Sequence, residues 1–114
     1  MITTKNVSGN WSEPIYFDQT GIDPDLFFDD DGSIYLSTAL PENGPVGGNS
    51  TIWQSKVDLS NGHSLTEPKM IYASDLPLKI RWAEGSHIYK INGTYYLAVA
   101  EGESYFGLPF YFAH

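Results

Sequence analysis

Two carboxylates stand at matching places in this sequence of 114 residues. Asp23 lies in the segment G-I-D-P-D, and Glu84 lies in the segment W-A-E-G-S-H. Each precedes a glycine, Gly32 or Gly93, by nine positions. Two carboxylates that face a common centre can divide acid–base work, because one can carry a proton while the other stays charged and acts electrostatically. The spacing therefore predicts a site at which Asp23 and Glu84 act together.

Each acid also has a plainer interpretation. Apolar neighbours and Pro24 flank Asp23, which suits a general acid or an electrostatic partner, but an aspartate before a strand often only caps backbone N–H groups. Glu84 at a strand edge is often merely solvated. It follows Trp82, which could form a stacking wall for a ring of a ligand or belong to the core. His87, three positions after Glu84, could reach a central ion or a substrate through water. The repeated spacing favours a catalytic pair, with Trp82 and His87 as candidate substrate-binding residues.

Metal-binding patterns are weak. The run from Asp29 to Gly32 lacks the alternating acids and the distal Glu of an EF-hand, so a solvated hairpin turn is expected there. His63 and His87 have no His or Cys partner at metal-ligand spacing, and the chain has no cysteine. His63 is expected to be a surface turn residue. The sequence predicts no metal and no cofactor.

The elements that position the acids read as two copies of a hairpin. Residues 83–100 repeat the design of residues 23–37: an acid, a short apolar run, a turn ending in glycine and a second apolar run. Laid over each other at an offset of 61, the copies align the two acids. Asp-Gly at 31–32 and Asn-Gly at 92–93 suit two-residue turns, since glycine adopts positive φ freely and Asp or Asn tolerates it. Both acids should therefore lie at the entrance of matching strands.

The rest of the chain also reads as strands. Aromatic residues make up 15% of it, with eleven Gly and seven Pro, which is typical of short strands joined by tight turns. A second repeated phrase, Glu-Pro at 13–14 and at 67–68, supports repeat architecture. No helix is expected. Alternation and turn signals predict strands at 25–29, 33–39, 51–58, 68–73, 86–90 and 94–100, and a loop at 41–48.

Composition argues against two classes of partner. The formal net charge is −8 and only six Lys and Arg are present, so a nucleic acid backbone is not expected as a partner. No apolar run is long enough to predict a membrane partner. A neutral substrate such as a sugar fits better. Residues 1–6 lack the pattern of a secretory signal, so the chain as it stands is expected to be cytoplasmic.

The motifs at 21–36 and 83–102 resemble glycoside hydrolase family 43, the β-xylosidase and α-L-arabinofuranosidase group of five-bladed β-propellers. The resemblance runs from about Asn10 to Gly102. It implies an all-β fold, a partial five-bladed β-propeller of about two blades, and inverting hydrolysis of pentose-containing oligosaccharides. By motif position, Glu84 looks like the general acid, and Asp23 looks like the carboxylate that modulates the pKa of the acid and orients the substrate.

The length matches only part of such a propeller. Residues 1–20 are expected to end one blade, 21–73 to form a complete blade and 74–114 to start the next. Propellers close with about four to eight blades, so the chain is expected to be a fragment whose exposed sheet edges favour self-association.

Two features depart from the family pattern. The general base is expected in an Asn/Asp-Pro motif on the first blade, and no residue at 1–20 matches it, since Asp18 lies on the wrong element. The tail from Glu103 to His114 also differs from the strand pair expected there. Three alternatives follow: a hydrolase fragment that is inactive until the rest of the propeller is supplied, a non-catalytic carbohydrate-binding module, or a gene remnant.

Overall fold

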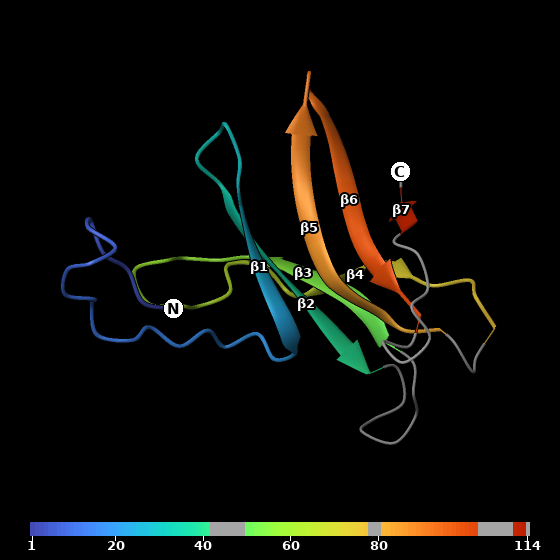
Figure 1. Ribbon diagram of the computed structural model, residues 1–114, viewed down its shortest axis with the longest axis horizontal. Coiled ribbons are helices and arrows are strands. Elements are labelled where there is room, and N and C mark those ends of the chain that lie inside the picture. Colours follow the sequence, from blue (N-terminus) through green and yellow to red (C-terminus); the bar gives the residue numbers. More distant parts are fainter. Residues whose placement is uncertain (42–49, 78–80, 103–110, 114) are drawn as a thin grey trace.

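The computed structural model describes residues 1–41, 50–77, 81–102 and 111–113, which form two antiparallel sheets and no helix. These ranges accordingly contain no helix of the length and hydropathy needed to cross a membrane. The first sheet has the order β1-β2-β3-β4 and the second has the order β5-β6-β7 (Figure 1). The strands are β1 (Ile22–Phe28), β2 (Ile34–Pro41), β3 (Ser50–Lys56), β4 (Lys69–Ala73), β5 (Ala83–Ile91), β6 (Thr94–Glu101) and β7 (Tyr111–Ala113).

All six strands predicted from the sequence are present, but both acid-bearing strands begin three residues earlier than expected. Asp23 and Glu84 therefore lie inside β1 and β5, not ahead of them. The third strand of the second sheet, β7, was not predicted. Of the predicted loop at 41–48, Pro41 ends β2, and the rest lies outside the described residues, as do 103–110 and 114 of the tail.

The second hairpin has the predicted two-residue turn. Asn92 and Gly93 have φ angles of 51° and 79°, and Ile91 pairs with Thr94. Positive φ at both central residues is the condition for the turn that matches the twist of the flanking strands.

The first hairpin has a longer turn than predicted. The Asp29 N–H donates to the Ser33 carbonyl at 2.9 Å, and only Gly32 in the turn has a positive φ, 82°. The carboxylate of Asp31 accepts the Ser33 N–H at 2.7 Å, which holds Asp31 in a local turn with negative φ. The loop therefore has three residues, 30–32, and the two-residue turn predicted at 31–32 was wrong.

Each hairpin carries a β-bulge beside its acid. The pairing of β1 with β2 skips residues 23–24, and the pairing of β5 with β6 skips residues 85–86. Each skipped pair begins with a positive φ, 49° at Asp23 and 58° at Gly85. Equivalent residues of the two bulges are therefore 62 positions apart. Equivalent residues of β2 and β6 are 61 positions apart, as predicted. The shorter second turn accounts for the difference.

A small apolar core joins the two sheets. Its buried members are Ala39, Ile52, Ala83 and Val99. Tyr72 and Leu97 pack against them, and the Ser50 hydroxyl donates to the Ala83 carbonyl at 2.6 Å across the sheets. Burial removes these apolar surfaces from water, which stabilises the contact between sheets. Ala83 therefore anchors the start of β5, the strand that carries Glu84.

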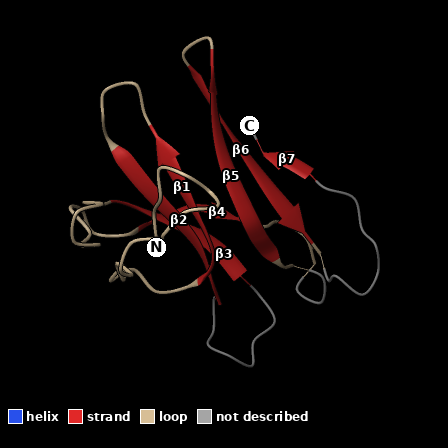
Figure 2. Cartoon of the chain, turned by 60° about the vertical axis from the view of Figure 1, so that its left-hand side comes forward, coloured by secondary structure: helices blue, strands red, loops and turns tan. Residues whose placement is uncertain are grey.

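The strands β1 and β5 lie side by side in both views, and salt bridges join them at their hairpin ends (Figures 1 and 2). Lys90 Nζ lies 2.6 Å from Asp29 Oδ1 and 3.0 Å from Asp30 Oδ2. The Tyr95 hydroxyl donates to Asp29 Oδ2 at 2.6 Å. The Asp29 side chain is only 8% exposed, so the expectation of a fully solvated turn does not hold for this residue.

Residues 1–20 form no strand, and most of them lie to the left of the first sheet, near the connection between β3 and β4 (Figure 1). Asp18 accepts hydrogen bonds from the N–H of Ser64 at 3.0 Å and from its hydroxyl at 2.6 Å, and His63 Nδ1 lies 3.3 Å away. His63 is an exposed turn residue, as predicted. Gln19 donates to Thr38 in β2 at 2.8 Å. These contacts attach the segment to β2 and to the connection between β3 and β4.

The contacts of Asp29 predict how stability depends on pH. The hydrogen bonds from Lys90 and then Tyr95 lower the pKa of Asp29 from its ordinary value of 3.8 to about 2. A lowered folded-state pKa adds stability above the unfolded value, and this contribution is lost as pH falls towards 2. The melting temperature of Asp29→Asn should therefore lie below that of the wild type at pH 6, and the gap should narrow between pH 4 and 2. Asp30→Asn, at an 85% exposed side chain, is the control. A gap that stays constant across this range contradicts the prediction.

Candidate active site

Asp23 contacts the backbone next to Glu84 where β1 and β5 run side by side. Asp23 Oδ2 accepts a hydrogen bond from the N–H of Gly85, the residue after Glu84, at 3.2 Å. Asp23 is exposed and Glu84 is half-buried. The structure therefore places the Asp23 carboxylate beside the backbone that follows Glu84. The residue of β5 equivalent to Asp23 is Gly85, however, so the expectation that the two acids occupy matching positions was wrong.

Trp82 contacts Glu84 directly. The indole Nε1–H donates to Glu84 Oε2 at 2.9 Å, and the tryptophan is half-buried. The two residues are two positions apart near the start of β5, where alternate side chains point to the same side. The bond fixes the orientation of the carboxylate.

His87 has a partner that the sequence did not indicate. Its Nδ1 lies 3.0 Å from Asp25 Oδ1, and the N–H of Ile88 donates to Asp25 Oδ2 at 3.4 Å. The uniform offset of 61 aligned His87 with Leu26, so Asp25 was missed. An offset of 62, which the bulges require, aligns His87 with Asp25 and would have found the pair.

The backbone that leads into Asp23 is closely packed. Gly21 has a φ of 130°, and a Cβ there would lie 2.6 Å from the Cβ of Thr38. Thr38 is the residue of β2 opposite the bulge, and its hydroxyl donates to the Thr20 carbonyl at 2.8 Å. Only glycine fits this approach, so Gly21 and Thr38 set the direction in which the chain enters the bulge at Asp23.

Comparison with known proteins identifies the family of the chain. Residues 1–107 match the family model of glycosyl hydrolases family 43. The chain belongs to this family. It is 39% identical over 111 residues to a xylosidase/arabinosidase of Butyrivibrio fibrisolvens, with 93% of this chain and 21% of that protein covered. It is 37% identical to xylosidase/arabinosidase 43B of Humicola insolens, with 90% of this chain and 19% of that protein covered.

Solved structures of family 43 share the fold. A GH43_12 protein from a capybara gut metagenome matches with a TM-score of 0.79 and 38% identity, covering 90% of this chain and 20% of its own. Xylan β-1,4-xylosidase from Bacillus halodurans matches with a TM-score of 0.72 and 37% identity, and the match covers 90% of this chain and 19% of the xylosidase chain. The chain thus spans about a fifth of the length of these relatives. The family and the all-β, partial propeller fold predicted from the sequence are confirmed.

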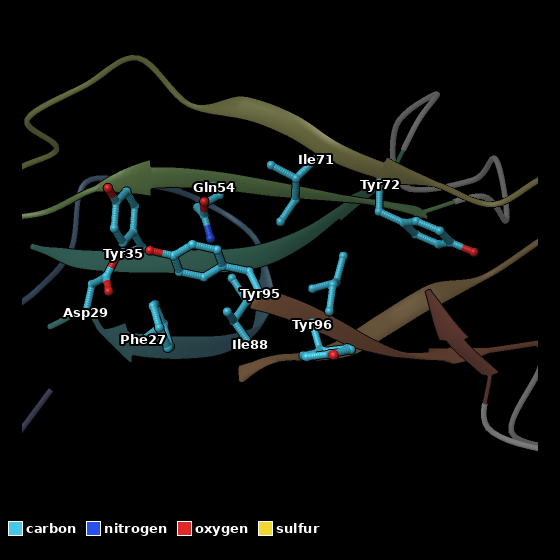
Figure 3. A pocket seen from close by; sticks show the side chains of 10 residues that line it. Phe27, Asp29, Tyr35, Gln54, Ile71, Tyr72, Ile88, Tyr95 and Tyr96 are labelled. Atoms are coloured by element: carbon cyan, nitrogen blue, oxygen red, sulfur yellow. Dashed lines mark hydrogen bonds between the residues drawn. The ribbon is translucent and has the colours of Figure 1, made fainter. Parts of the chain in front are cut away.

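A cavity of about 470 Å³ in this family-43 chain lies between the two sheets, away from the acids. Figure 3 shows the rings of Tyr35, Tyr95 and Tyr96 between the strands. Neither Asp23 nor Glu84 lines this cavity, so it is separate from the candidate acids. Within the described ranges, no group of three His, Cys, Asp or Glu side chains is arranged to hold a metal ion.

The packing at Gly21 predicts a selective cost of substitution. Gly21→Ala should lower the free energy of unfolding by about 2 kcal/mol or more, because it adds backbone strain and a clash with Thr38. Gly32→Ala is the matched control, since Gly32 also has a positive φ but no atom within 4 Å of the added Cβ, and it should cost about 1 kcal/mol. Urea denaturation of both variants measures the difference. Equal costs would show that the approach of Thr38 does not constrain the bulge.

Proposed function

We propose that this chain contributes a general acid, Glu84, and a modulating carboxylate, Asp23, to the inverting hydrolysis of glycosidic bonds in pentose-containing oligosaccharides. The observation that carries the proposal is the hydrogen bond from the Gly85 N–H to Asp23 Oδ2, at 3.2 Å. This bond attaches the Asp23 carboxylate to the backbone of the residue after Glu84, which supports a joint role for the two acids. Two relatives are named as xylosidase/arabinosidases, which supports a pentoside as the substrate.

The hydrogen bond from Trp82 suggests which oxygen of Glu84 carries the proton. An indole N–H can only donate, so Oε2 must act as the acceptor in that bond. The oxygen without the hydrogen is the stronger acceptor of a carboxylic acid, so this bond favours the proton for the substrate on Oε1. When the bond between the anomeric carbon and the leaving oxygen breaks, that oxygen takes this proton while a water molecule adds to the opposite face of the sugar.

The water must lose a proton to a base about 6.5–9.5 Å from the acid. The resemblance expects this base on a preceding blade, so the activity belongs to a complete propeller. Within it, residues 21–73 would form one blade, 1–20 would end the blade before it and 74–114 would start the blade after it. Trp82 and His87 remain proposed contacts to the substrate.

Replacement of the acid tests the proposed role. Residues 10–102 are built into the aligned segment of the GH43_12 protein, which gives a complete propeller that carries Glu84. Glu84→Gln should lower kcat on unactivated xylo- or arabino-oligosaccharides by about 10²–10⁴-fold. The loss should be much smaller on nitrophenyl glycosides, because nitrophenolate leaves without a proton. Glu67→Gln, an exposed residue outside the site, is the control. An equal loss on both substrates would exclude Glu84 as the acid, and oligosaccharide binding without turnover would favour a carbohydrate-binding module.

We also propose that the isolated chain associates with itself through exposed sheet edges. Met70 and Ile71, on the edge strand β4, are 53% and 39% exposed. Analytical ultracentrifugation should show association that rises with concentration and weakens at least tenfold in Met70→Lys/Ile71→Lys, because lysine on an edge strand opposes pairing with another chain. Val7→Lys, at an 82% exposed residue outside the sheets, should not change it. A monomer at all concentrations would exclude the proposal.

A further inference from the structure

The two bulges contact each other at equivalent residues. Gly85 lies 62 positions after Asp23 and donates its N–H to that carboxylate. His87 lies 62 positions after Asp25 and contacts that carboxylate through its ring. The two strands β1 and β5 belong to different sheets, so no β-ladder sets the register between them. Among the described residues around the bulges, the side-chain carboxylates of β1 set the register between β1 and β5 instead.

Asp25 holds β5 with both of its oxygens. Oδ1 lies 3.0 Å from His87 Nδ1, and Oδ2 accepts the N–H of Ile88 at 3.4 Å. An ionised carboxylate can only accept, so the imidazole must carry its proton on Nδ1 in this contact. The pair is directly beyond the bulge, where β5 resumes regular pairing with β6 at His87. Asp25 thus fixes the end of the β5 bulge that follows residues 85–86, whereas Glu84 lies at the other end.

We infer that Asp25 is a positioning residue, which sets the place of Glu84 relative to Asp23 by holding His87 and Ile88. The inference rests on the proposed function of the two acids. Asp23 alone attaches the bulge at one point, Gly85, about which β5 can rotate. The second attachment, at residues 87 and 88, removes that rotation. A bulge held at two points keeps Glu84 at a constant distance from Asp23.

The chain contains a matched control for this contact. Asp18 lies 3.3 Å from His63 Nδ1 and accepts the N–H of the next residue, Ser64, at 3.0 Å. This is the same arrangement of a carboxylate, a histidine ring and the following amide. It lies on the connection between β3 and β4, where it does not contact either bulge. Asp18→Asn therefore weakens an equivalent contact without touching the acids.

Hydrogen exchange in this 114-residue chain tests the contact without any activity. Asp25→Asn replaces one accepting oxygen with a donor, so it should speed exchange at the Ile88 amide by about tenfold or more. The informative amide is Gly85, which is bonded to Asp23 and not to Asp25. Faster exchange there as well would show that the bulge has moved off Asp23. Asp18→Asn should leave both amides unchanged. An unchanged Gly85 amide in a folded Asp25→Asn chain would overturn the inference.

Kinetics of the complete propeller described above test the consequence. Asp25→Asn should lower kcat about 10- to 100-fold with little change in KM, because a misplaced acid still binds substrate. The pH at which kcat/KM falls by half on the alkaline side should also shift, which a purely structural role would not cause. If Asp25→Asn fails to fold, His87→Ala should give the same loss of kcat and the same shift of the pH profile, together with a rise in KM from the loss of its proposed contact to the substrate. His87→Asn should restore kcat and the pH profile because its amide donates from the place of Nδ1.

The outcomes separate the two proposals. If Glu84→Gln has no selective effect on unactivated substrates, the proposed function fails whatever Asp25 does. If Glu84→Gln behaves as expected but neither Asp25→Asn nor His87→Ala shifts the pH profile, only the positioning role of Asp25 is excluded.

Discussion

The structure depends on how two strands of different sheets are held together without a shared ladder. β1 and β5 lie side by side, yet each pairs only with the next strand of its own sheet. Backbone N–H groups of β5 that face β1 need acceptors, because an unpaired N–H away from water is costly. Asp23 and Asp25 supply them for Gly85 and Ile88. The carboxylates of the first sheet therefore take the place of ladder carbonyls.

The small core makes these polar contacts more important. Two of its four buried members are alanines, whose small side chains contribute little apolar area to burial. The salt bridge between Asp29 and Lys90 adds a third link near the hairpin ends. The same chemical group, a carboxylate on β1, thus serves both the packing of the sheets and the candidate site. A change in charge on β1 would affect both together.

Local pattern was enough to predict most strands and the pair of acids. Alternation and turn residues indicated six strands, and the repeat indicated that Asp23 and Glu84 belong together. The bulges could not be predicted, because a skipped residue depends on cross-strand pairing and on close contacts such as that of Gly21 with Thr38. The contact of Asp25 with His87 was missed for the same reason. Strand alternation predicts that Trp82 and Glu84 point to the same side, but it does not show that the indole N–H donates to the carboxylate.

The unequal turns of the two hairpins have a consequence for comparing internal repeats. In an antiparallel hairpin, a residue lost at the tip changes the numbering of one arm relative to the other but moves neither arm in space. The turn of the second hairpin is one residue shorter than that of the first, so the bulges of the two hairpins still contact each other. Copies aligned on their turn glycines are therefore displaced by one along the arms that carry the acids. Repeats of this kind are correctly superposed on their bulges, where the backbone geometry, and not the loop length, is shared.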